Sequence, residues 1–175
     1  DPAFLGRAKA NRELESDRKN AAEGKEALTP ELHRIIALLE AAGAPDASDS
    51  RDFLEKVMTG SAIYARKPGD GSAREQAASC QKVLDVWANI ARDYATKRYR
   101  SNLVNWGVLP FILPEEFDAL PVDSFLYVPR IRKSVEEGSF QTNGYVVSGE
   151  KVSTITLQLP GLSGAERTIL LCGNV

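Results

Sequence analysis

The chain has 175 residues, enough for one domain with a substantial core, because about 70% of the unfolded surface can be buried at this size. Its 43% hydrophobic and 26% charged residues are ordinary for a globular protein, and the formal net charge is −2. This charge gives no overall reason to expect binding to nucleic acid or to a membrane surface. No apolar run approaches the length of a transmembrane span, and no secretion signal is visible at the start.

The N-terminal third predicts helices. Residues 1–27 are charged and rich in alanine, and they are typical of a solvated helix or a frayed arm. A second helix is predicted between an N-cap at Thr29 and a terminating glycine at Gly43. Ser50 is suited to cap a short helix after it. We therefore expect an N-terminal helical segment over residues 1–56.

The middle of the chain permits two interpretations. A short strand is expected at 62–65, and helical spacing follows from 72 to 84. The apolar positions between 80 and 94 fit one long helix, but 86–91 alone could be a buried strand followed by a second helix. Hydrophobic periodicity does not separate these alternatives.

The C-terminal part changes from helical to β-rich patterns. Residues 105–117 are interpreted as a loop, because glycine and proline punctuate them. The pair Asn143-Gly144 is a turn signal. Helices and strands are thus mixed in one domain, which predicts the α/β or α+β class. The β-rich segments are 123–129, 138–149, 150–160 and 166–173.

The cysteine and histidine content disfavours two kinds of site. Cys80 and Cys172 belong to no Cys-x-x-Cys pair, and we interpret both as reduced thiols of a cytoplasmic protein. Cys80 is expected as a small core residue on its helix. A zinc site or a serine–histidine pair would depend on His33 alone, which we expect at the surface.

Two further groups of residues are interpreted as structural. Trp87 and Trp106 are expected to pack in the core, although either could stack on a ligand. The basic run 97–100 is expected to be a solvated helix end, although it could also bind phosphate or face a cleft.

The stretch "PGDGSAREQAAS", residues 68–79, carries the chemistry of the sequence. Gly69 and Gly71 permit backbone angles that bring N–H groups close to a ligand. A helix that begins near Ser72 adds unpaired N–H groups and the positive end of its dipole, which bind phosphate or carboxylate. Arg74 adds a fork suited to carboxylate, and Glu75 could cap the helix or orient that arginine.

The spacing of this stretch matches neither a P-loop nor a dinucleotide-binding loop. On physical grounds alone, a glycine-rich turn capped by Ser72 explains it as well as an anion site does. A serine at such a helix end can also act as a base without a histidine, because its alkoxide is stabilised there.

Three stretches together resemble one family. "GDGSAREQAAS" resembles the Gly-Ser-Ser-Arg-Glu loop of the aconitase superfamily, and "RSNLVNWGVLPF" is similar to that family's Thr-Asn-Leu and Gly-Leu-Leu-Pro-Leu stretch. The tail "TITLQLPGLSGAERTILL" is similar to its closing β-hairpin. The resemblance covers residues 57–172 and points to the hydratase branch.

The resemblance implies an architecture. Residues 57–175 would form the C-terminal swivel domain, a β/β/α three-layer α/β unit of the aconitase and isopropylmalate dehydratase small-subunit type. The resemblance also favours a strand at 86–91 followed by a helix. The chain would then be a fragment of a larger enzyme, inactive when isolated.

The resemblance also implies a reaction, the reversible dehydration of a hydroxy-polycarboxylic acid. Ser72 matches the serine that removes a proton, and Arg74 matches the arginine that holds a substrate carboxylate. Ala73 replaces a second serine, so only its backbone N–H could contact substrate, which puts citrate in doubt. Gly69 and Gly71 would supply loop backbone.

The cofactor implied is a [4Fe-4S] cluster bound by other domains of the parent enzyme, because Cys80 and Cys172 do not provide its grouped cysteines. The expected partners are those cluster-bearing domains and a small carboxylic acid. Two alternatives remain: a separate small subunit, and a non-catalytic module that only binds an anion.

Overall fold

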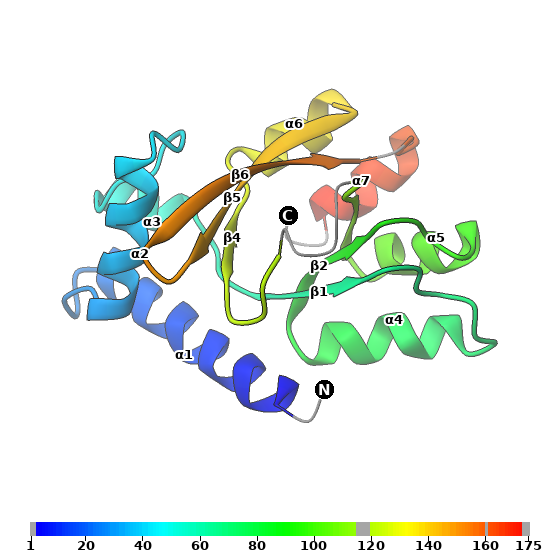
Figure 1. The fold of residues 1–175 in the computed structure, drawn as a ribbon, viewed down its shortest axis with the longest axis horizontal. Coiled ribbons are helices and arrows are strands. Elements are labelled where there is room, and N and C mark those ends of the chain that lie inside the picture. Colours follow the sequence, from blue (N-terminus) through cyan, green and yellow to red (C-terminus); the bar gives the residue numbers. More distant parts are fainter. Residues whose placement is uncertain (1–2, 115–119, 160, 173–175) are drawn as a thin grey trace.

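The computed structural model describes residues 3–114, 120–159 and 161–172. Helices and strands are mixed along the described part of the chain, which confirms the predicted α/β class (Figure 1). In chain order the elements are α1 (Phe4–Ala22), α2 (Pro30–Ala41), α3 (Arg51–Lys56), β1 (Ser61–Ala65), α4 (Arg74–Val83), β2 (Val86–Ala91), α5 (Lys97–Asn105), β3 (Leu109–Ile112), β4 (Phe125–Tyr127), α6 (Ile131–Glu137), β5 (Gln141–Ser148), β6 (Lys151–Gln158) and α7 (Gly164–Cys172).

The strands form one mixed sheet in the order β1-β2-β3-β6-β5-β4. β1, β2 and β3 pair in parallel, and β6, β5 and β4 pair antiparallel. The two halves meet at a single described pair, Ile112 with Gln158. Parallel neighbours require crossover connections, which α4 and α5 provide. The strand at 86–91 followed by a helix is therefore confirmed, and the single long helix is excluded.

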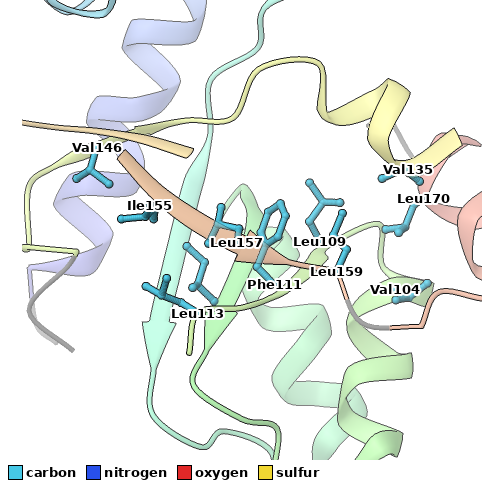
Figure 2. Close-up of a cluster of buried hydrophobic side chains, with 11 residues drawn as sticks. Val104, Leu109, Phe111, Leu113, Val135, Val146, Ile155, Leu157, Leu159 and Leu170 are labelled. Carbon is cyan, nitrogen blue, oxygen red and sulfur yellow. The ribbon is translucent and has the colours of Figure 1, made fainter. Parts of the chain in front are cut away.

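One apolar cluster joins the two halves of the sheet. Phe111 and Leu113 reach it from the parallel half, and Ile155 and Leu157 from β6 (Figure 2). Helices α5, α6 and α7 complete it with three buried side chains: Val104, Val135 and Leu170. Burial of these side chains stabilises the junction, which only one strand pair bridges.

The N-terminal helices pack beside the β5–β6 hairpin, as Figure 1 shows. Ile35 and Leu39 of α2 share a buried cluster with Val147 of β5. The helix predicted after Thr29 is confirmed, and Gly43 beyond its end has φ +71°. The predicted cap of α3 is also confirmed, because Ser50 Oγ accepts a hydrogen bond from the Phe53 N–H at 3.3 Å.

A buried ion pair fixes α1 to the segment after α3. Arg18 is 5% exposed and donates to both Glu15 carboxylate oxygens at 2.8 Å, and also to the Leu54 carbonyl. Thr59 donates to Glu15 from its N–H at 2.9 Å. Burial alone would raise the pKa of Glu15, but the hydrogen bonds from Arg18 and Thr59 outweigh it and lower that pKa.

The loop predicted at 105–117 is wrong in its centre, because residues 109–112 form the strand β3. Leu109 and Phe111 are buried there. Pro110 lacks an N–H group, but β3 meets β6 only at Ile112, so this part of the strand has a free edge that tolerates proline. The last three residues of the predicted loop, 115–117, lie outside the part of the chain that the structure describes.

The turn predicted at Asn143-Gly144 is also wrong. β5 continues through both residues, and the hairpin turns at Gly149, where φ is +57°. Gly144 is needed for packing instead, because a Cβ there would lie 2.8 Å from Leu126 Cδ1.

The strand predicted at 166–173 is replaced by the helix α7 over its described residues, so the tail is not wholly a hairpin. The sequence did contain the signal for this helix. Ser163 Oγ accepts from the Glu166 N–H at 3.3 Å, and the Glu166 carboxylate accepts from the Ser163 N–H at 2.8 Å. This reciprocal pair is a capping box.

Two side chains predicted in the core lie at the surface. Cys80 is exposed, because the buried face of α4 carries Ala78. Trp106 is also exposed. Trp87 is half-buried, and the Lys82 Nζ lies 4.1 Å from the centroid of its ring. His33 is exposed as predicted. None of the described helices has the length and apolar character needed to cross a membrane.

Replacing Glu15 with glutamine tests the buried pair. We expect the free energy of unfolding at pH 7 to fall by about 3 kcal/mol, because Arg18 loses its buried partner. Urea unfolding at several pH values measures this. Since folding lowers the pKa of Glu15, the difference from wild type should shrink as the pH falls from about 4.5 through that lowered value.

The matched control is Glu55→Gln, which removes the exposed pair between Glu55 and Arg51. Its effect should stay below about 0.5 kcal/mol. Equal effects of the two variants at pH 7 would contradict the stabilising role of the buried pair.

Candidate functional site

The loop between β1 and α4 is held by backbone bonds to the next loop. The Asp93 N–H donates to the Arg66 carbonyl at 3.2 Å, and the Ala95 N–H donates to the Pro68 carbonyl at 3.0 Å. These bonds continue the β1–β2 pairing beyond the strands. The glycine-rich stretch therefore begins from a fixed position beside the N-terminus of α5.

A pocket of about 370 Å³ lies at this loop. All five residues predicted from the sequence line it: Gly69, Gly71, Ser72, Ala73 and Arg74. Asp70, Ala77 and Tyr99, which were not predicted, complete the lining. The structure thus brings the predicted residues to one place, on a wall that combines one acidic and one basic side chain with apolar surface.

Gly69 is required by its surroundings. Its φ is +96°, and a Cβ would lie 2.4 Å from Cγ of the Tyr99 ring. Its carbonyl accepts two hydrogen bonds at 3.1 Å, from Arg74 Nε and from Thr96 Oγ1. Gly71 differs, because a Cβ there would meet nothing within 4 Å and its φ is not in the left-handed region. Only Gly69 therefore needs to be glycine.

Ser72 is exposed and makes no side-chain hydrogen bond to any described residue. It is not the N-cap, so the alternative of a capping serine is wrong. The cap position belongs to Ala73, whose side chain cannot accept a bond from the first-turn N–H groups. These N–H groups and the Ser72 hydroxyl thus lie together at the positive end of α4.

Arg74 is half-buried at the first position of α4. Its Nε is used by the Gly69 carbonyl, and no ion pair with an acidic side chain is found among the described residues. Glu75 does not orient it, because the Glu75 carboxylate accepts from Trp106 Nε1 at 2.6 Å. A guanidinium whose terminal nitrogens make no ion pair has the geometry to bind a carboxylate with two hydrogen bonds.

A buried network supports the pocket from below. The Tyr99 hydroxyl accepts from Gln81 Nε2 at 2.7 Å and from Asn89 Nδ2 at 3.4 Å. Burial raises the pKa of Tyr99, and it raises that of Tyr94 well above its ordinary value. Tyr94 donates to the Asn89 carbonyl at 2.8 Å. The network joins α4, β2 and α5 beneath the loop.

Tyr99 and Thr96 were not among the residues predicted for the site. Tyr99 lies within the basic run 97–100, and its side chain is buried while Lys97 and Arg98 are exposed. The predicted solvated helix end is therefore only partly right. Thr96 could have been found as a capping residue, because its Oγ1 accepts from the Tyr99 N–H at 3.2 Å.

The described residues do not fit a resident metal cluster. No three His, Cys, Asp or Glu side chains among them gather closely enough to hold a metal ion. Cys80 and Cys172 are free and exposed, and they share no buried site. No chemical step is therefore assigned to a metal held by residues 3–114, 120–159 and 161–172.

The site combines a helix end without a side-chain cap with a serine and an arginine, which is the arrangement that the resemblance to the aconitase superfamily predicts. No family model matches the sequence. The chain is 43% identical over 70 residues to the homoaconitase small subunit of Thermus thermophilus, which is 39% of this chain and 42% of that protein. It is 38% identical over 66 residues to aconitate hydratase A of Streptomyces viridochromogenes, covering 38% of this chain and 7% of that protein.

Among solved structures, 3-isopropylmalate dehydratase of Methanocaldococcus jannaschii matches with a TM-score of 0.49 and 30% identity, over 72% of this chain and 66% of that one. The two curated relatives confirm the predicted resemblance to the aconitase superfamily. The chain spans less than half the length of either of them.

The two glycines of the loop provide a test of the site geometry. Gly69→Ala should lower the free energy of unfolding by about 1–3 kcal/mol, because its Cβ would collide with the Tyr99 ring at a positive φ. Gly71→Ala should change it by less than about 0.5 kcal/mol. Urea unfolding of both variants gives the comparison, and a Gly69→Ala protein as stable as wild type would contradict this description.

Proposed function

We propose that this chain supplies the swivel-type domain of an aconitase-like hydro-lyase. The observation that carries the proposal is that Ser72 and Arg74 line one pocket at the uncapped N-terminus of α4. The relatives are named as a homoaconitase subunit and an aconitate hydratase, which supports the same reaction class. The reaction is the reversible dehydration of a hydroxy-polycarboxylic acid.

In this mechanism Arg74 binds a substrate carboxylate through its terminal nitrogens, while Nε stays on the Gly69 carbonyl. Ser72 Oγ, as the alkoxide, removes the proton next to the carboxylate. The electron pair of that C–H bond forms the C=C bond, and the hydroxyl on the adjacent carbon leaves as hydroxide, so that one water is lost overall. The positive end of α4 and the nearby guanidinium stabilise the alkoxide that this requires. The proposed mechanism uses no histidine. His33 lies on α2, which packs beside the β5–β6 hairpin.

Ala73 narrows the substrate class. It offers no hydroxyl, so a substrate group near it can be bound only by backbone N–H, with apolar surface from Ala77 and the Tyr99 ring close by. Citrate is disfavoured for this reason. A carboxylic acid less polar than citrate suits this wall better.

The remaining components lie outside this chain. We propose that a [4Fe-4S] cluster is held by cluster-bearing domains, in the same polypeptide or in a separate large subunit, and that it supplies a Lewis-acidic iron. The chain would act in the cytoplasm, without nucleic acid or membrane, and would be inactive alone. We propose that residues 1–56 form an N-terminal helical segment and that residues 57–175 form the swivel-type domain.

A second candidate is a non-catalytic module that binds an anion. Ala73 favours it, because one hydroxyl expected in the family is missing. Anaerobic expression of the full-length parent separates the two. A brown protein with iron and hydratase activity toward unsaturated diacids supports the enzyme, whereas a folded, colourless protein without iron supports the binding module.

Ser72→Ala tests the base. In the assembled enzyme we expect turnover to fall by about a thousandfold or more, with little change in substrate binding, because only proton removal is lost. Steady-state kinetics measure both quantities. Ser79→Ala is the matched control, since Ser79 donates only to the Gln76 carbonyl on the same helix. Turnover near that of wild type in Ser72→Ala would remove this serine from the mechanism.

Arg74→Lys tests the carboxylate clamp. The lysine keeps the charge but loses the planar fork, so we expect KM to rise by about tenfold or more and turnover to change less. An unchanged KM would show that Arg74 does not bind substrate.

A further inference from the structure

We propose that Thr96 is a positioning residue that aims Arg74 at the substrate carboxylate. This inference rests on the proposed function, because it concerns how the same pocket is built. Thr96 lies at the N-cap of α5, on a different crossover from the loop that carries Ser72 and Arg74. It reaches that loop through one atom, the carbonyl oxygen of Gly69.

The Gly69 carbonyl is held from two sides. Thr96 Oγ1 and Arg74 Nε both donate to it at 3.1 Å. The Tyr99 ring occupies the space on the remaining side of Gly69, where a Cβ would collide with it. The carbonyl therefore has one available orientation, and this orientation determines where the Arg74 guanidinium is anchored.

Thr96 is itself fixed by its second hydrogen bond. The same oxygen accepts from the Tyr99 N–H at 3.2 Å, so the hydroxyl proton is directed away from the helix and toward Gly69. Without the hydroxyl, the Gly69 carbonyl would keep only the hydrogen bond from Arg74 Nε. Arg74 would then sample more orientations, and each bound carboxylate would have to restrict them.

The test uses the 175-residue chain and tricarballylate, a tricarboxylate without a hydroxyl, as the probe. Thr96→Val removes the hydroxyl and keeps the shape, Thr96→Gly removes it with little loss of capping, and Thr96→Ser restores it. Ser50→Ala is the matched control, because it removes a helix cap at α3. Two quantities are measured: the tricarballylate Kd by calorimetry, and the rate of water exchange of the Arg74 Nε proton by NMR.

Valine and glycine at position 96 should each raise the Kd by about fivefold and speed Nε exchange by a similar factor, the size expected for one lost hydrogen bond. Serine at 96 and Ser50→Ala should stay within about twofold of wild type. If both Thr96→Val and Thr96→Gly have the same Kd and the same Nε exchange rate as wild type, the positioning role of Thr96 is overturned. The proposed carboxylate site is not affected by that result. Failure of wild type to bind tricarballylate would overturn the proposed carboxylate site as well.

Discussion

The parallel pairing of β1 with β2 and of β2 with β3 is the constraint on which the site depends. Parallel neighbours must be joined by crossovers, and here α4 and α5 are those crossovers. Both helices consequently begin at the carboxyl ends of their strands. Their positive ends come to the same edge of the sheet, where open α/β sheets bind ligands.

The two helix ends are used differently. The α5 end is closed by Thr96, whereas the cap residue of α4 is Ala73, which accepts no bond from the helix. Among the described residues, the helix end that carries Ser72 and Arg74 therefore lacks the side-chain cap that the α5 end has. The buried network of Gln81, Asn89 and Tyr99 joins α4, β2 and α5 at this edge, in addition to the bonds that hold the loop itself.

The sequence predicted the elements whose signals are local. The helix start at Thr29, the Ser50 cap and the glycine loop were visible because capping and turn chemistry depend on neighbouring residues. The Thr29 side chain itself makes no capping hydrogen bond. The missed helix α7 is an exception, because its capping box is a local signal. The other errors concern packing across the chain. Asn143-Gly144 has the composition of a turn, but Gly144 lies within β5 and packs against Leu126. Residues 109–112 have the composition of a loop, but Pro110 is tolerated in a strand because β3 pairs with β6 only at Ile112.

The candidate site divides in the same way. Ser72, Ala73 and Arg74 were found because they are adjacent in a motif. Thr96 and Tyr99 were not found, because their role arises only when a second crossover lies beside the first. Whether the motif binds carboxylate in this chain stays a proposal, which local pattern and geometry support together.

The most direct measurement is an NMR titration of the 175-residue chain with tricarballylate, following backbone amides and the Arg74 Nε signal. The account predicts that the shifts concentrate at residues 71–76 and at the Arg74 side chain. Binding that leaves these signals unchanged, or shifts only at distant elements such as α2 or β5, would contradict it.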